Sequence, residues 1–297
     1  MRLAGTLRAL GNRPQTANRL VRMSAVLAAP YLPTAPKDGP SHAEAYPHGL
    51  CSLSEQPTTI YSALKRLGPT FEETPMPSPS MFIKPASVFY EFDGRRKRWD
   101  VVENHPSVGA VLYHKGLQCF LIVRQFRPAV YATELRAASL NSLPAPSRVV
   151  GFTYELCAGL IDKAKSVKQI VKEEIAEEVG FEVPLERIHD LGSSVSSAGT
   201  SGARHAMFYA EVDDSMRASA GGGLQDHNEC IEVLALPLDS TPAFVLDGAL
   251  PKSPGLMFGL LWGYHTVKQR GSLAEAPTAN WNPNLTQELT LQPVLPA

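Results

Sequence analysis

The stretch 159–181 most constrains the fold of this chain, because it combines the signals of a capped helix with acidic residues on its apolar side. Ser166 and Gln169 have the spacing of a capping box, and Gly180 is suited to end the helix. Apolar residues recur at helical spacing between these ends, namely Val167, Ile170, Val171, Ile175 and Val179. The sequence therefore predicts an amphipathic helix over 167–179 that packs on a core.

Three glutamates of this helix, Glu174, Glu177 and Glu178, stand at positions i, i+3 and i+4, so their carboxylates converge. At about 100° per residue, Glu174 and Glu178 fall inside the arc of the apolar stripe, and Glu177 lies at its edge. Burying neighbouring carboxylates is unfavourable, because they lose hydration and repel each other. A divalent cation relieves both effects, and carboxylate oxygens suit Mg²⁺ or Mn²⁺. A solvated acidic helix face is the weaker interpretation.

The same stretch resembles the Nudix box of the Nudix hydrolases. The matching residues are Gly159, Glu174, Ile175, Glu177, Glu178, Gly180 and Phe181. Lys165 stands where the family usually has Glu, and Glu173 stands where it usually has Arg. Because these departures are opposite in sign, our hypothesis is a reversed ion pair between Lys165 and Glu173. The resemblance implies an α/β/α sandwich with a mixed sheet, preceded by an N-terminal antiparallel strand region.

The segment 124–131, RQFRPAVY, resembles a segment of the Nudix enzymes that hydrolyse ADP-ribose and UDP-sugars. The resemblance implies that Arg127 contacts the diphosphate or ribose of the substrate. Phe126 and Tyr131 are candidates for stacking on the base. From chemistry alone, a salt-bridged arginine at a strand end with core aromatics explains the segment equally well.

The residues just before the box, Glu155 to Gly159, resemble the Glu-Leu-Pro-Ala-Gly entry of the family, with Cys157 in place of the usual Pro. The match implies that the carbonyl of Ala158 is a metal ligand. It also implies that Glu155 orients the substrate or holds the loop.

The stretch 221–233 begins with three glycines, which predict a pliable loop, and continues with acids into a strand. In the resembled enzymes the equivalent loop closes over the site and supplies a further carboxylate. Glu229 is the best candidate for that metal ligand or for activation of water. Other candidates, in second place, are Asp226, His227 and Glu232. A structural role for each acid stays open.

Residues 194–204 are small and polar, which predicts a loop near the substrate. Arg204 is a candidate phosphate contact in this loop. A solvated loop without a role in binding explains the stretch equally well.

The composition narrows the classes of protein. The 297 residues include 44% hydrophobic residues, enough for a sizeable core, and the net charge of −1 gives no electrostatic footprint for nucleic acid. No apolar run approaches the roughly 20 residues of a membrane span. The four cysteines do not have the spacing of a metal site, which favours reduced thiols and a cytoplasmic protein. Together with the charge and the lack of a long apolar run, this predicts a protein that binds neither nucleic acid nor membrane.

The chain divides into segments of different composition. Residues 1–37 hold five arginines and no acid, which resembles a mitochondrial transit peptide, although an untargeted tail is the alternative. Residues 38–80 form a Pro/Ser-rich linker, and 81–272 form the Nudix domain, followed by a tail over 273–297. Relatives in this branch are dimers in which N-terminal strands cross to the partner. The matching region here is 82–102, so we expect a homodimer.

Alternation and turn residues predict the remaining elements. Asp93-Gly94 predicts a hairpin whose second strand starts with four basic residues, and Lys115-Gly116 predicts a second turn. The predicted strands are 87–92, 95–102, 108–113, 117–125, 152–160, 188–192, 206–212 and 230–236. A loop is predicted over 136–149, and helices over 242–246 and 254–268.

The resemblance, which covers about residues 82–270, implies an activity. We expect metal-dependent hydrolysis of a nucleoside diphosphate sugar, with Mg²⁺ as cofactor and Mn²⁺ as a substitute. The expected reaction converts UDP-glucose to UMP and glucose 1-phosphate. The alternatives are an ADP-ribose diphosphatase, which forms AMP and ribose 5-phosphate, or a catalytically weak Nudix-like nucleotide-binding protein.

Overall fold

The structure, a computed structural model, describes residues 46–54, 71, 73–74, 80, 82–140, 151–223 and 231–270. The chain divides into two units, Met1–Pro33 and Thr34–Ala297, and every described residue belongs to the second. The predicted transit segment, most of the linker, the tail 273–297 and the candidate Glu229 therefore lie outside the described residues.

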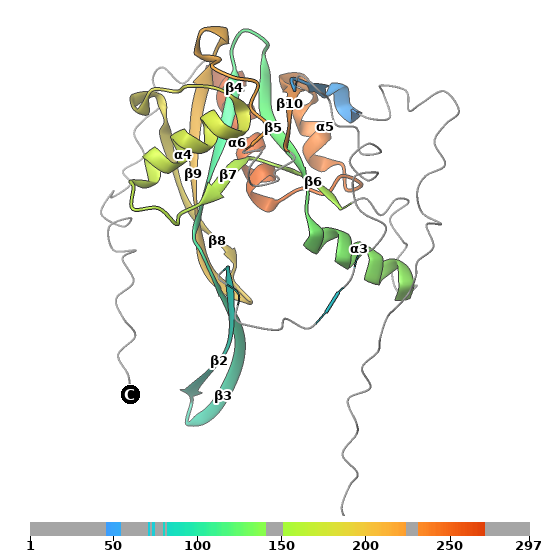
Figure 1. Cartoon of the computed structure of the whole chain (residues 1–297), viewed down its shortest axis with the longest axis vertical. Coiled ribbons are helices and arrows are strands. Elements are labelled where there is room, and N and C mark those ends of the chain that lie inside the picture. The colour runs from blue at the N-terminus through green and yellow to red at the C-terminus, as the bar shows by residue number, and fades with distance from the viewer. Residues whose placement is uncertain are drawn as a thin grey trace, which may run out of the picture. The chain divides into compact units, whose positions relative to one another are not determined.

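A mixed eight-stranded sheet forms the centre of the described domain (Figure 1). Its strand order is β1-β10-β5-β4-β9-β8, with β6 paired to β5 and β7 paired to β4. Strands β4 and β9 run parallel, whereas the other pairs are antiparallel. The strands are β1 Cys51–Ser52, β4 Ser107–His114, β5 Cys119–Phe126, β6 Phe152–Glu155, β7 Cys157–Leu160, β8 His189–Ser197, β9 Ser201–Val212 and β10 Ile231–Pro237.

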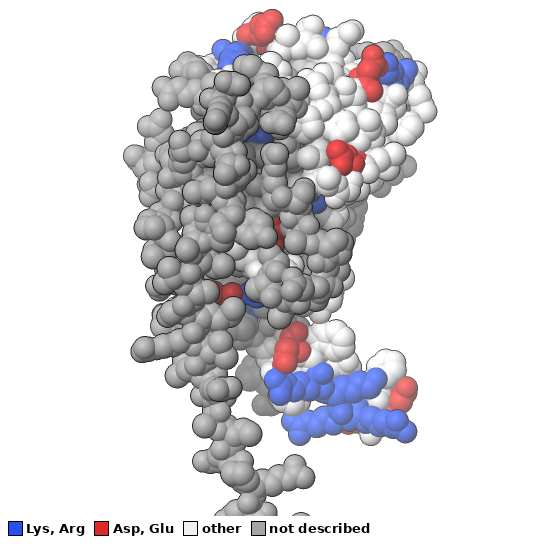
Figure 2. All heavy atoms as spheres, turned by 90° about the vertical axis from the view of Figure 1, so that its right-hand side faces the viewer, with Lys and Arg blue, Asp and Glu red and all other residues white. Residues whose placement is uncertain are grey.

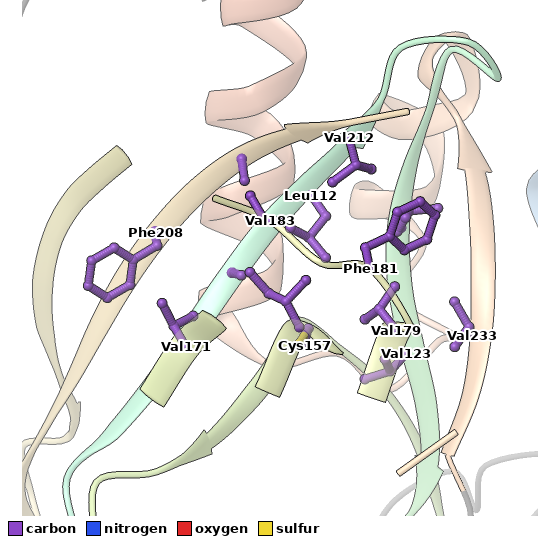
Figure 3. Packing of buried hydrophobic residues seen from close by; sticks show 14 of the residues in the cluster. Leu112, Val123, Cys157, Val171, Val179, Phe181, Val183, Phe208, Val212 and Val233 are labelled. Atoms are coloured by element: carbon purple, nitrogen blue, oxygen red, sulfur yellow. The ribbon is translucent and has the colours of Figure 1, made fainter. Parts of the chain in front are cut away.

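Helices cover both faces of this sheet, which confirms the predicted α/β/α sandwich. Because side chains alternate along a strand, Leu121 and Val123 of β5 pack towards α4, whereas Phe120 and Ile122 pack towards α6. Figure 3 shows the core on the α4 side. The helices of the two layers are α4 Val167–Glu174 with its continuation η2 Ile175–Val179, and α5 Thr241–Leu246 with α6 Pro254–Arg270. No helix in the described part of the chain is long and apolar enough to cross a membrane.

Residues 46–54, which the sequence assigns to the linker, fold onto the domain as a 3₁₀ turn and strand β1. Strand β1 pairs with β10, and the Leu53 amide donates to the Val233 carbonyl at 2.9 Å. A two-residue strand has no periodicity that the sequence could display. The short helical turns of the domain are η1 Pro47–Gly49, η3 Leu185–Arg187, η4 Asp214–Met216 and η6 Leu238–Ser240.

The predicted loop over 136–149 is wrong at its start, because helix α3 spans Pro128–Leu140. Pro128 occupies the first helical position, where its missing N–H is tolerated, and alanines follow it. These local helix signals continue through residue 140.

The predicted loop over 194–204 is also wrong. Strands β8 and β9 form a long hairpin with a turn at 198–200, and Val195 pairs with Arg204. Backbone pairing does not require apolar side chains, so an exposed hairpin accommodates this small, polar sequence. The predicted single strand 152–160 is interrupted at Leu156 and becomes β6 and β7.

A second, two-stranded sheet consists of β2 Ile83–Phe92 and β3 Arg95–Asn104. Asp93 and Gly94 both have positive φ, 52° and 65°, as a type I′ turn requires, so the predicted hairpin is confirmed. Both strands are largely exposed, and Figure 2 shows Lys and Arg side chains gathered over this hairpin. The Val102 amide donates to the Thr200 carbonyl at 2.7 Å, which ties the hairpin to the β8–β9 turn.

Candidate active site

The predicted helix over 167–179 is confirmed, and its capping box is complete. The Ser166 hydroxyl accepts from the Gln169 amide at 3.3 Å, and the Gln169 side chain accepts from the Ser166 amide at 3.0 Å. The last turn, Ile175–Val179, widens into a π-helix, and the Gly180 amide donates to the Ile175 carbonyl at 3.0 Å. Such π turns recur at functional sites, and this one carries two of the three candidate glutamates.

The glutamates pack against strand β7, which carries the residues before the box. Glu178, only 6% exposed, accepts from the Ala158 amide through Oε2 at 3.0 Å. A side chain at Gly159 would overlap the carboxylate of Glu174. The Glu174 carboxylate thus lies directly against the backbone of Gly159, in the space that a Cβ would take.

The Cys157 thiol is buried next to the glutamates of the box, and its pKa responds to their charge. Burial raises the pKa of Cys157 well above its usual value, and the carboxylates of Glu178, Glu174 and Glu177 raise it further. One of these contributions is a hydrogen bond with Glu178. The Glu178 carboxylate thus lies against the start of strand β7, where it contacts both Cys157 and the Ala158 amide.

A divalent cation fits the chemistry of this site, since hard carboxylate oxygens converge beside a backbone segment. Within the described ranges, no three His, Cys, Asp or Glu side chains are grouped so that they could hold a metal ion by themselves. The ligand set Glu174, Glu177, Glu178, Ala158 and Glu229 therefore stays a prediction.

The reversed ion pair between the two departing positions of the box is confirmed. The ammonium of Lys165 donates to the Glu173 carboxylate at 2.5 Å, and Lys163 lies 3.8 Å from the same carboxylate. The hydrogen bond from Lys165 lowers the pKa of Glu173. The exchange of signs thus keeps an attraction between the loop and the helix.

Arg127 and Glu155 form a bidentate ion pair at the ends of β5 and β6. The guanidinium donates through Nε at 2.8 Å and Nη2 at 2.7 Å, and Gln125 donates to the same carboxylate at 3.3 Å. Burial raises the pKa of Glu155, but the hydrogen bonds and charge of Arg127 outweigh it, so the net pKa is lowered. Arg127 is still 47% exposed. The structure thus places a held but accessible guanidinium there.

Register shows which face of the sheet this pair belongs to. Glu155 stands opposite Val123, whose side chain packs in the core on the α4 side. Directly opposite residues of antiparallel strands share a face. Glu155 therefore lies on the same face as the glutamates of the box, as the predicted substrate site requires.

Phe126 and Tyr131 come together, with ring centroids 5.5 Å apart, and Phe152 flanks Phe126 at 5.7 Å. Phe71 meets Tyr131 edge-on at 5.0 Å. The sequence predicted the first two rings as candidates for stacking on the base. It did not predict Phe71, because a single aromatic residue in a Pro/Ser-rich stretch carries no signal. Gly151 is also part of this cluster, since its Cβ would lie 2.6 Å from Cβ of Tyr131.

Two further candidates are Arg204 and Glu232. Arg204 is exposed on β9, where its Nη1 donates to the Ser193 hydroxyl at 3.4 Å. Glu232 is wrong as a candidate catalytic acid, because it is buried in an ion pair with Arg124 on the α6 face. Glu229 lies outside the described residues.

Comparisons with known proteins show what the chain is similar to. No family model matches the chain. It is 36% identical over 201 residues to the uridine diphosphate glucose pyrophosphatase of Bos taurus, across 63% of this chain and 90% of that protein. It is 32% identical over 207 residues to the Mus musculus protein of the same name, across 65% of this chain and 93% of that protein. It is 35% identical over 167 residues to the GDP-mannose pyrophosphatase of Citrobacter koseri, across 54% of this chain and 78% of that protein. These relatives are Nudix hydrolases, and the chain accordingly belongs to the Nudix hydrolases, enzymes that cleave a diphosphate bond.

Proposed function

We propose that this protein hydrolyses the diphosphate bond of a UDP-sugar and converts UDP-glucose to UMP and glucose 1-phosphate. The names of the Bos taurus and Mus musculus relatives support the substrate. The observation that carries the proposal is the packing of two acids of the box, Glu174 and Glu178, against strand β7 beside Ala158 and Gly159. A solvated acidic helix face would not bury Glu178 against the amide of Ala158.

We propose Mg²⁺ as the cofactor, with Mn²⁺ as a substitute. The carboxylates of Glu174, Glu177 and Glu178 and the carbonyl of Ala158 would hold it, and Glu229 is the proposed fifth ligand or the base for the attacking water. When bound, the cation supplies positive charge that stabilises the phosphoryl oxygens as the anhydride bond breaks.

The ion pair of Arg127 and Glu155 supports a role in holding the substrate. Glu155 accepts two hydrogen bonds from Arg127 and fixes its guanidinium plane, which suits phosphate recognition. Phe126 and Tyr131 lie close by in sequence and in space, and we propose them as the surface on which the base stacks. Arg204 stays a candidate phosphate contact from the exposed β8–β9 hairpin.

The test compares UDP-glucose, ADP-ribose and GDP-mannose with the full-length protein and Mg²⁺, with the products separated by ion-exchange chromatography. We expect the fastest turnover with UDP-glucose. Glu178→Gln should lower kcat/KM roughly 100-fold, about 2.7 kcal/mol of transition-state stabilisation. Glu182→Gln is the matched control, because Glu182 is exposed and 3.6 Å from Lys172.

The outcomes of this test separate the alternatives. Faster formation of AMP and ribose 5-phosphate from ADP-ribose would replace the proposed substrate. Metal binding without turnover of any of the three substrates would indicate a catalytically weak nucleotide-binding protein.

We also propose a homodimer formed through the β2–β3 hairpin. A lone two-stranded hairpin is marginally stable in water, and exposed apolar patches mark interaction surfaces. One face of this hairpin carries Val88, Tyr90, Phe92 and Trp99, all between 41% and 57% exposed. The same face also carries Lys97 and Arg95, opposite Tyr90 and Phe92. A second copy of the hairpin would cover the apolar residues of this face.

Light scattering after size exclusion tests the dimer. We expect a dimeric mass for the wild type and a monomeric mass for Phe92→Ser. Phe258→Ser is the control, because Phe258 is equally exposed, at 53%, on α6. A monomeric wild type at micromolar concentration would contradict the proposal.

The location of the protein in the cell is a separate proposal. We propose that residues 1–37 direct it to mitochondria when they are present, and that the protein otherwise stays in the cytoplasm. Fusion of 1–37 to a fluorescent protein tests this, and diffuse fluorescence would contradict it.

A further inference from the structure

The stretch 218–223, here called the glycine strap, wraps around the end of the box helix. The Ala218 amide donates to the Gly180 carbonyl at 2.8 Å. The Gly222 amide donates to the Glu178 carbonyl at 2.8 Å, and the Gly223 amide donates to the Glu177 carbonyl at 3.2 Å. The strap therefore holds the main chain of two of the three candidate metal ligands.

These hydrogen bonds have a clear physical reason. The last turn of a helix leaves backbone carbonyls without partners inside the helix. In this helix the last turn is the π turn that carries Glu177 and Glu178. The strap supplies N–H groups to both carbonyls and so fixes the turn in its widened form.

Glycine is required where the two backbones interlock. Gly221, Gly222 and Gly223 all have positive φ, at 69°, 104° and 80°. A Cβ at Gly221 would lie 2.5 Å from the Glu178 carbonyl oxygen, and a Cβ at Gly180 would overlap the Ser219 carbonyl. The sequence predicted a pliable loop here, whereas these glycines serve close contact between two backbone segments.

We infer that the glycine strap is a positioning element of the site, and this inference rests on the proposed function. The strap fixes the backbone of Glu177 and Glu178, and the backbone in turn determines where their carboxylates lie. The Glu178 carboxylate then meets the Ala158 amide at 3.0 Å. The strap carries no charged side chain, and its one hydroxyl, that of Ser219, accepts from the Gly221 amide at 3.2 Å within the strap. We therefore expect the strap to act through the residues that it holds.

The test measures Mn²⁺ affinity by electron paramagnetic resonance, without substrate, on the full-length protein. Gly221→Ala should weaken Mn²⁺ binding about tenfold, as loss of outer support of metal ligands does. Gly192→Ala is the matched control, because Gly192 also has positive φ, 95°, but nothing lies within 4 Å of its Cβ position. This control introduces the same backbone strain away from the helix and should leave the affinity within about twofold of the wild type.

The thermal midpoint is measured for each variant, and binding is assayed well below it. Equal Mn²⁺ affinity for Gly221→Ala and Gly192→Ala would overturn the inference. Should Gly221→Ala fail to fold, amide hydrogen exchange of the wild type decides. The Gly222 and Gly223 amides should exchange at least about tenfold more slowly once Mg²⁺ is bound, and unchanged exchange would overturn the inference.

The variant Glu178→Gln distinguishes failure of the proposed metal site from failure of the proposed role of the strap. If Glu178→Gln binds Mn²⁺ as tightly as the wild type, the proposed metal site itself is wrong. If Glu178→Gln loses Mn²⁺ while Gly221→Ala retains it, the site stands and only the role of the strap is wrong.

Discussion

The buried pair of Arg124 and Glu232 gives the sharpest stability prediction. The two side chains are 1% and 3% exposed, and Glu232 accepts from Arg124 at 3.0 Å and 2.5 Å. Glu232→Gln keeps the shape of the side chain but leaves the guanidinium buried without its counter-charge. Breaking a buried pair in this way costs about 3–5 kcal/mol. We expect a loss of about 3 kcal/mol, because glutamine still offers one acceptor oxygen.

Tyr46 provides a graded comparison within the same network. Its hydroxyl donates to Oε1 of Glu232 at 2.6 Å. Tyr46→Phe removes the hydrogen bond to Glu232 but leaves the ion pair, so we expect a loss of about 1–3 kcal/mol. The double variant should lose less than the sum of the single losses, because the residues share one network.

The assay is urea unfolding of the full-length protein at pH 7, with stability taken from the midpoint and slope. Glu182→Gln, on the surface, should change stability by less than about 1 kcal/mol. A loss below about 1 kcal/mol for Glu232→Gln would refute the reasoning. A large fall in kcat at unchanged stability would instead restore Glu232 as a catalytic acid.

Three further predictions concern the ion pair of the box, alkaline pH and the aromatic cluster. Lys165→Glu and Glu173→Arg should each slightly lower the free energy of unfolding, and the double variant should recover most of the loss; a double variant no better than either single one contradicts the pairing. Burial and, second, the hydrogen bond to Glu232 raise the pKa of Tyr46 from 10 to about 12. The phenol therefore stays protonated up to a higher pH in the folded state than in the unfolded state. Its contribution to stability is complete below pH 10 and is lost as pH rises to 12, and urea unfolding of Tyr46→Phe across that range should show a shallower fall. Gly151→Ala should displace the Tyr131 ring and raise KM for UDP-glucose more than it lowers kcat, and an unchanged KM would exclude this ring from base binding.

Features that depend on nearby residues were predictable from the sequence. The box helix has its cap, stripe and stop signal within one short stretch, so its limits follow from local chemistry. The same holds for the Asp93-Gly94 turn, whose residue types allow positive φ. The reversed pair of Lys165 and Glu173 was predictable because Lys165 lies just before the box helix and Glu173 lies within it, so the two residues are close in sequence.

Features that depend on distant residues were not predictable. Arg124 and Glu232 are 108 positions apart, and the sequence does not show that their strands are neighbours. Strand β1 and Phe71 lie in a Pro/Ser-rich stretch, where two residues or one ring give no periodic signal. The three glycines at 221–223 indicated only backbone freedom. The structure shows that this freedom allows the glycines to pack against the backbone at the end of the box helix.

The alternation of side chains along β5 explains how two arginines three positions apart acquire different roles. Arg124 is inside the strand and points to the α6 face, where Tyr154 stands opposite and Glu232 neutralises it. Arg127 follows the end of the strand, so the alternation no longer fixes its direction. It reaches Glu155, whose partner in the register, Val123, packs on the α4 face. The end of β5 thus separates an arginine that stabilises the fold from one whose partner, Glu155, lies on the same face of the sheet as the glutamates of the box. We therefore expect substitution of Arg124 to act on stability and substitution of Arg127 to act on substrate binding.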